Sequence, residues 1–234
     1  MKYNNKEIIL PKNKNVILPL IIFSNLFPLY GVINYNWTIF SVVYIYWVEL
    51  LIISTFQLLK IMLAQGDKSA TFFSKFALAA RFFFVRTGMF FFYLIFIVVF
   101  LGFLLTAKDS DSDAGLHMFD VIFFKGAFYR ITLLSFVIYN LVEFLVLYIL
   151  NHEYKKATPA DNYQILDIHI IVVHIVVVLG TFLYQGVTES LHWNHKSAMI
   201  ACVSLFVVVK IIADIIRQSL SGDIPEEQKE NLFN

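Results

Sequence analysis

Residues 38–63 read TIFSVVYIYWVELLIISTFQLLKIML, and this stretch decides the fold class. Only Glu49 and Lys60 are charged within it. A helix that crosses the hydrocarbon core of a bilayer needs about 20 mostly apolar residues, because each residue advances the helix by roughly 1.5 Å. The stretch meets both conditions of length and hydropathy, and it therefore predicts a membrane-spanning helix.

Similar apolar segments lie on both sides of this one. Two other apolar stretches, Phe72–Phe84 and Met118–Tyr129, carry interspersed charges and predict interfacial amphipathic helices. The sequence thus predicts an all-α fold, a polytopic transmembrane helical bundle with six spanning helices. Residues 1–220 form one transmembrane domain and residues 221–234 a polar cytoplasmic tail. The predicted spans are Val16–Tyr35, Thr38–Leu63, Thr87–Thr106, Ile131–Leu150, Ile165–Val187 and Ser197–Ile216.

The composition agrees with a membrane protein. Hydrophobic residues make up 59% of the 234 residues and charged residues 15%, whereas soluble domains have about 45–50% and ~25%. Lipid can cover outward faces as apolar as a protein core, so the lipid bilayer is the expected partner. A net charge of +1 gives no reason to expect a nucleic-acid partner. The single cysteine, Cys202, cannot form an intramolecular disulfide.

The first apolar run follows four lysines, as in a signal peptide. No small-x-small cleavage site follows, and the run continues through Pro28 and Gly31. We therefore expect a retained first span. Pro28 removes one backbone hydrogen bond and predicts a kink, near which Asn25 could bind free backbone groups.

Basic residues in the tails, in the loops and at the ends of the spans are unevenly distributed between the two sides. Thirteen lie on the side that holds both termini, the connection 63–86 and the loop 151–164, against four on the other. Because basic residues accumulate in cytoplasmic loops, we expect a multi-pass protein of the cell membrane, a bacterial inner membrane, with both termini cytoplasmic. The thirteen are Lys2, Lys6, Lys12, Lys14, Lys60, Lys68, Lys75, Arg81, Arg86, Lys155, Lys156, Arg217 and Lys229; the four are Lys108, Lys125, Arg130 and Lys196.

Five of the ionisable residues within the predicted spans are candidates for a site: Glu49, Glu143, His174, Lys210 and Asp214. A charge at the centre of a spanning helix costs roughly 2.5–3.5 kcal/mol, so such side chains face the bundle interior or a wet cavity and have partners. We predict that the five meet in one layer as a substrate- or ion-binding site. Helical spacing adds polar neighbours on the same faces: Tyr46, Gln57 and Lys60, then Asn140, then Asp167, then Arg217.

Two interpretations of this cluster stay open. In the functional one, the cluster handles protons, an ion or a polar substrate. In the structural one, Lys210 pairs with Asp214, and Glu49 stays protonated and hydrogen-bonded between helices. For His174 alone, a satisfied interhelical hydrogen bond is the favoured interpretation.

Two weaker patterns on the outer side suggest metal ligands. The aspartates of Asp109–Asp120 are spaced as in a calcium loop, but Ala114 replaces the expected Gly and Asp120 the expected Glu, which favours a solvated acidic loop. The motif Glu189-x-x-His192-x-x-His195, on the same side as His117, could bind a transition metal, although His residues also suit an interfacial belt.

The sequence has no HExxH, GxSxG, Walker or Rossmann motif. The first functional hypothesis is therefore a proton- or ion-linked transporter or a channel-like protein. The second is a non-catalytic membrane scaffold or partner subunit, with a homo-oligomer as an alternative. An intramembrane metal-dependent enzyme is the weakest, no catalytic residue is assigned, and the cofactors are unknown.

The chain also resembles a family of small prokaryotic polytopic membrane proteins of unknown function. The resemblance implies the fold and the topology but no activity. The matching positions are Asn25-Leu-Phe-Pro-Leu-Tyr-Gly-Val32, Trp37, Tyr46-Trp-Val-Glu49, Lys60, Glu153-Tyr-Lys-Lys-Ala-Thr-Pro159, His174 and the pair Lys210 and Asp214.

The chain departs from that family in three places. Arg86 and Asn140 stand where family members often have His, and Leu50 replaces an Asn. If the family builds a His-rich metal site in the membrane, we expect this chain to lack it in that form.

Overall fold

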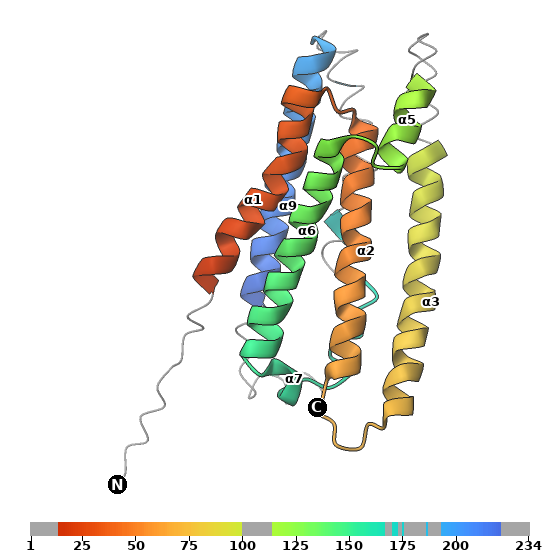
Figure 1. Ribbon diagram of the computed structural model, residues 1–234, viewed down its shortest axis with the longest axis vertical. Coiled ribbons are helices and arrows are strands. Elements are labelled where there is room, and N and C mark those ends of the chain that lie inside the picture. The colour runs from red at the N-terminus through yellow and green to blue at the C-terminus, as the bar shows by residue number, and fades with distance from the viewer. Residues whose placement is uncertain are drawn as a thin grey trace.

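The computed structural model describes residues 14–99, 114–166, 170–172, 175, 186 and 193–220, all of them helical or in turns and loops (Figure 1). The predicted all-α class is confirmed for these residues. The long helices run side by side and nearly parallel to one axis. The elements are α1 (Lys14–Tyr35), α2 (Ile39–Leu63), α3 (Phe72–Phe96), α5 (Ala114–Ile122), α6 (Ala127–Glu143), the π-helical η2 (Phe144–Leu150), α7 (Glu153–Lys156) and α9 (His195–Leu220).

Among the residues that the structure describes, five helical segments are long and apolar enough to cross a membrane. Many of their large apolar side chains point outward, most clearly Phe73 and Phe84 of α3, which are more than two-thirds exposed. Such faces match lipid rather than water. The predicted sixth span, Ile165–Val187, lies almost wholly outside the described residues, so the count of six stays a prediction. The five are Ile17–Tyr35, Ile39–Leu63, Phe72–Val99, Met118–Leu150 and Lys196–Arg217.

The boundaries of the second helix agree with the prediction and have a local cause. Thr38 precedes α2, and its hydroxyl accepts a hydrogen bond from the Ser41 amide at 3.3 Å. A threonine in this position satisfies one of the amide groups that a helix start leaves free. Thr71 caps α3 through Ser74 in the same way.

The prediction of a separate interfacial helix at Phe72–Phe84 is wrong. Residues 72–84 are the first half of α3, which continues without a break into the predicted third span. The two charges that suggested an interfacial position both contact other parts of the protein: Lys75 donates to the Ala64 carbonyl, and Arg81 lies 5.9 Å from the centre of the Tyr163 ring. By contrast, α5 is a separate short helix, joined to α6 by a turn at 123–126.

α2 is the most enclosed helix, because α3, α5, α6 and α9 all pack on it. Its N-terminal half is buried almost continuously, from Ile39 to Trp47. α1 lies against α6 and α9 and is thus part of the bundle, as a retained first span requires. Glu49, in the middle of α2, is fully buried in this packing.

The turn between α1 and α2 is built around a glycine. Gly31 lies directly beneath the indole of Trp37, and a Cβ atom at this position would lie 2.5 Å from Trp37 Cδ2. The indole is buried and stacks on Tyr129 of α6, with ring centroids 4.2 Å apart. This contact ties the first turn of the chain to α6, and it gives a physical reason for a Gly and a Trp six residues apart.

At the opposite end of the bundle, two loops bind each other through their backbones. The Gln65 amide donates to the Tyr154 carbonyl at 2.7 Å, and the Gly66 amide donates to the Ala157 carbonyl at 2.9 Å. The Cβ position of Gly66 is occupied by the Lys156 carbonyl. Only a glycine therefore lets the α2–α3 loop lie against the segment that contains α7.

Gly66→Ala is expected to separate these two loops, because a backbone carbonyl cannot move aside as the end of a flexible side chain can. Overpacking typically costs about 1–3 kcal/mol, and the effect here should be local. Limited proteolysis with trypsin, which can cut after Lys68, should become faster than in the unmodified protein. Gly88→Ala is the control, since a Cβ there meets nothing within 4 Å; equal cleavage rates in the two variants would contradict the prediction.

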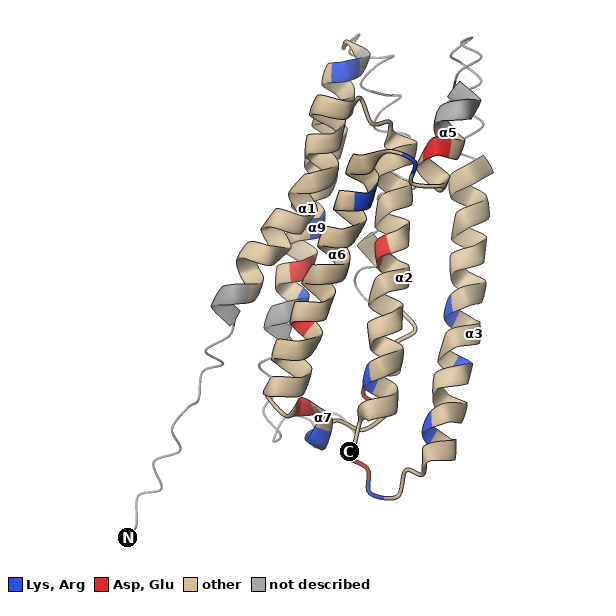
Figure 2. Ribbon diagram, in the orientation of Figure 1, with Lys and Arg blue, Asp and Glu red and all other residues tan. Residues whose placement is uncertain are grey.

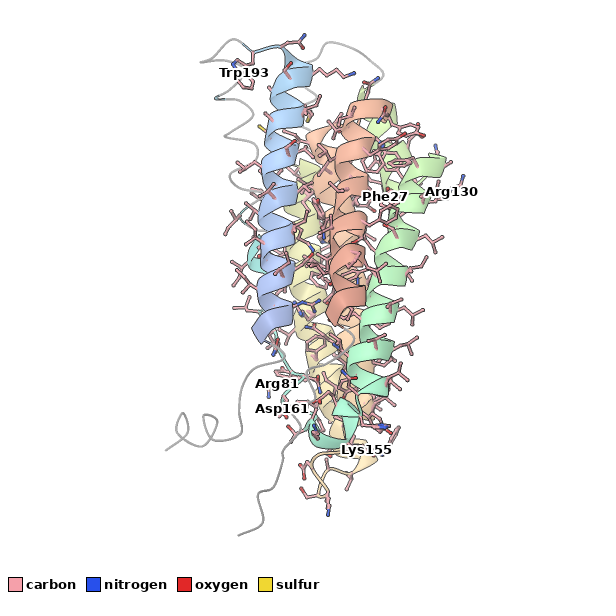
Figure 3. The ribbon with its side chains drawn as sticks, turned by 90° about the vertical axis from the view of Figure 1, so that its left-hand side faces the viewer. Phe27, Arg81, Arg130, Lys155, Asp161 and Trp193 are labelled. Carbon is pink, nitrogen blue, oxygen red and sulfur yellow. The ribbon has the colours of Figure 1, made fainter. Side chains whose placement is uncertain are left out.

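The described helix ends alternate between the two ends of the bundle. The start of α1, the α2–α3 loop, α7 and the end of α9 lie at one end, and the α1–α2 turn, α5 and the start of α9 lie at the other (Figure 1). Lys155 and Asp161 mark the first end, and Arg130 and Trp193 the second (Figure 3). We refer to the end with α7 as the α7 end.

Candidate functional site

Lys210 of α9 lies between two carboxylates in the middle of the bundle. Its ammonium donates to Glu49 Oε1 of α2 at 3.1 Å and to both carboxylate oxygens of Asp214 at 2.9 Å. None of the three side chains is more than 2% exposed. Lys210 and Asp214 are four residues apart, which places them on one face of α9. The structure thus brings together three of the five predicted site residues.

Asn25 of α1 completes this group. Its amide nitrogen donates to Asp214 Oδ2 at 2.8 Å and to the Ile21 carbonyl one turn earlier at 2.9 Å. The sequence suggested only the second, local role. The contact with Asp214 joins residues 189 positions apart, and helical spacing within one segment cannot reveal such a pair. We call Asn25, Glu49, Lys210 and Asp214 the central cluster.

Three buried polar atoms around the central cluster have no hydrogen-bond partner among the described residues: Glu49 Oε2, the Tyr46 hydroxyl and Asn25 Oδ1. Tyr46 lies one turn before Glu49 on α2. A buried polar atom without a partner costs about 1–3 kcal/mol, so such a set is rare unless water, a proton or an ion satisfies it. All three atoms are oxygens, which suits a proton or a small cation.

Glu143 lies in a different layer. Arg217 of α9 donates to Glu143 Oε2 at 2.5 Å and to the Tyr139 hydroxyl at 3.2 Å. Arg217 is seven residues after Lys210, which is two helical turns or about 10.5 Å along α9. The predicted single layer is therefore two layers, with Glu143 near the α7 end. Figure 2 shows acidic and basic positions within the height of the bundle on α2, α6 and α9.

The two layers differ in formal charge. The central cluster has two carboxylates and one ammonium ion, an excess of one negative charge. The layer near the α7 end has the guanidinium of Arg217 and the ammonium of Lys60 with the carboxylates of Glu143 and Asp161, so its formal charges balance. Of these two layers, it is the central cluster that has an excess of charge.

A cavity of about 130 Å³ lies beside the second layer. It is bounded by α2, α6, η2, α9 and the segment 161–164, and its walls include the side chains of Lys60, Glu143 and Arg217. One water needs only ~10–15 Å³ of such space, so the cavity can hold several waters or a small molecule. η2 begins directly after Glu143, and π-helical turns often occur at functional sites.

Arg86 of α3 is a further buried charge that we did not include in the predicted site. Its guanidinium donates to Gln57 of α2 and lies over the rings of Phe82 and Phe90, 5.2 and 5.8 Å from their centroids. Aromatic faces stabilise such a cation. A second cavity, of about 100 Å³, separates this part of α3 from α2.

The remaining predicted ligands are only partly described. His174, Glu189 and His192 lie outside the described residues, and of His117 in α5 and His195 at the start of α9 only the backbone is described. In the part of the chain that the structure covers, no three His, Cys, Asp or Glu side chains group as a metal site would require. The side chains that we proposed as metal ligands are therefore not described, and the metal-binding hypothesis stays a prediction.

Comparison with known proteins gives a family but no activity. The model of a family of unknown function (DUF6498) matches residues 11–231. No curated protein and no solved structure matches the chain.

Proposed function

The chain belongs to this family of unknown function, and we propose that it is a proton- or ion-linked transporter or channel-like protein of the cell membrane whose coupling site is the central cluster. The observation that carries the proposal is the charge imbalance around Lys210. One ammonium ion is bound by two buried carboxylates, Glu49 and Asp214. A proton or a monovalent cation on this site would remove the excess negative charge.

The contacts of the cluster support a coupling role. Asn25, Glu49 and the pair on α9 come from three helices, so a change of charge on one carboxylate changes the attraction between helices. α1 is also the helix that contains Pro19 and Pro28. Each proline removes one backbone hydrogen bond and favours a bend in the helix, so α1 suits a role in which the helix that contacts the cluster moves.

We propose that the α7 end faces the cytoplasm. Basic side chains of the described loops and helix ends concentrate there, including Lys68, Lys75, Arg81, Lys155 and Lys156 (Figures 2 and 3). Such an excess is typical of the cytoplasmic side. The cavity beside Arg217 would then be the cytoplasmic entrance to the central cluster.

Glu49→Gln is the direct test. The amide keeps the size of the side chain and one acceptor for Lys210, but it cannot bind a proton or share a cation as a carboxylate does. We expect flux to fall at least about tenfold, because a titrating group is lost from the coupling site. Proteoliposomes with an internal pH-sensitive dye, under imposed Na⁺, K⁺ or voltage gradients, measure it.

The matched control is Glu153→Gln, which makes the same chemical change at an exposed residue of α7. It should leave flux unchanged. Size-exclusion chromatography should show the same folded yield for both variants. Equal flux from Glu49→Gln and the unmodified protein would exclude Glu49 from the mechanism.

A further inference from the structure

The cavity at the α7 end has a composition that the central cluster does not explain. Its side chains are mainly polar: Lys60 from α2, Asn140 and Glu143 from α6, Arg217 from α9, and Asp161 and Asn162 from the loop after α7. A cavity that merely separates spanning helices would be lined by apolar groups. This one lies at the end of the bundle where a solute could enter.

Lys60 is the most informative member. The Tyr148 hydroxyl donates to the Lys60 backbone carbonyl at 2.8 Å, while the ammonium lies 5.7 Å from the centre of the Tyr148 ring. No carboxylate of the described residues forms an ion pair with this ammonium, although Glu143 lines the same cavity. The ammonium therefore keeps its capacity to bind an anion.

Arg217 contributes a second cationic group with remaining donor capacity. One terminal nitrogen binds Glu143 and Tyr139, but Nε is buried and has no partner in the described part of the chain. Asn140 donates one amide hydrogen to the Phe136 carbonyl, which leaves its second hydrogen for a ligand. These donors come from three helices, α2, α6 and α9.

We propose that this cavity binds a small carboxylate anion, held between the ammonium of Lys60 and the guanidinium of Arg217. A planar carboxylate matches the forked donors of arginine, which a spherical ion does not. The volume of about 130 Å³ has room for a ligand of a few carbon atoms. Asp161 lies at the exposed edge of the cavity, where its carboxylate already accepts from the Thr158 amide at 2.8 Å.

The inference rests on the proposed function in one respect, since it names the class of solute that a transporter with this entrance would carry.

Glu143 gives the site a specific property. Its carboxylate occupies the guanidinium that the ligand would use, so ligand and Glu143 compete for Arg217. Neutralising Glu143 should therefore strengthen binding, which a purely structural ion pair would not do.

Equilibrium binding of [¹⁴C]acetate to the purified full chain in detergent tests the site. We expect saturable binding that Lys60→Met weakens at least about tenfold, as the loss of one charge-assisted contact implies. The substitution retains the backbone carbonyl that Tyr148 binds. Lys68→Met, which removes a positive charge from an exposed loop at the same end, should bind acetate as the unmodified protein does.

Glu143→Gln provides the second arm, with an expected rise in acetate affinity of several-fold. Excess chloride should displace acetate poorly. Equal competition by chloride would overturn the carboxylate class, and unsaturable binding, or equal binding by the Lys60 and Lys68 variants, would overturn the site. Acetate binding without any flux in proteoliposomes would support this site while contradicting the transport proposal, so the two failures are distinguishable.

Discussion

Lys210→Met is expected to lower the free energy of unfolding by about 3–5 kcal/mol, the usual cost of removing one partner from a buried ion pair. The substitution leaves Glu49 and Asp214 close together with no cation between them. Two neighbouring buried carboxylates repel each other when charged and are costly to desolvate. Equilibrium unfolding in mixed detergent micelles measures the loss, and a reduced folded yield is expected as well.

The triple variant Glu49→Gln, Lys210→Met, Asp214→Asn should recover most of this stability. It removes all three charges together, and a neutral buried cluster avoids the desolvation of ions. The amide that Asp214→Asn introduces would still accept a hydrogen bond from Asn25 through its side-chain oxygen. A triple variant as unstable as Lys210→Met would show that shape rather than charge determines the cost.

The same triple variant separates the two main hypotheses for the protein. If the central cluster couples transport, the folded triple variant should carry no flux. If the protein is a non-catalytic scaffold, the cluster is structural and the folded variant should retain whatever partner binding the unmodified chain has. A folded triple variant with normal flux would contradict the proposed function.

Gly31→Ala is expected to have the second largest effect on stability. The added Cβ would lie 2.5 Å from Trp37 Cδ2, so the indole must move. Trp37 is buried and stacks on Tyr129, whose hydroxyl hydrogen-bonds Ser41 at 3.1 Å. A shift of the indole therefore reaches α6 and the first turn of α2. Overpacking of this kind costs about 1–3 kcal/mol.

Gly88→Ala is the matched control for that variant too. Gly88 lies inside α3 and a Cβ there has open space, so the better helix propensity of alanine should make the change neutral or stabilising by up to about 1 kcal/mol. In a Trp37→Leu background, Gly31→Ala should cost much less than in the unmodified chain. A cost that stays the same in both backgrounds would show that the Trp37 contact is not its origin.

The sequence predicted the helices because their signals are local. Hydropathy over about 20 residues identifies a spanning segment, and Thr38 as a cap determines where α2 begins. The separate interfacial helix at residues 72–84 was wrong because Lys75 and Arg81 lowered the local hydropathy. Whether a charge ends a span depends on what surrounds it, and Lys75 donates to the Ala64 carbonyl while Arg81 lies over the Tyr163 ring.

The identity of the buried charges was likewise readable from sequence, whereas their pairing was not. The high cost of a charge in hydrocarbon singles out Glu49, Glu143, Lys210 and Asp214 wherever they lie in an apolar run. That Glu143 binds Arg217 rather than joining Lys210 depends on the relative height of α6 and α9, which packing sets. Glu143 and Arg217 are 74 positions apart in the chain.

The sequence by itself therefore determined that the chain is a bundle of apolar helices with a few costly ionisable groups, since hydropathy, capping and charge cost act within single segments. Only the tertiary structure decided that these groups form two separate layers, that Asn25 joins one of them, and that a polar cavity lies beside the other. The physical reason is that ion pairs and cavities arise between helices. Their geometry follows from how the helices are rotated and displaced against one another, which no single segment specifies.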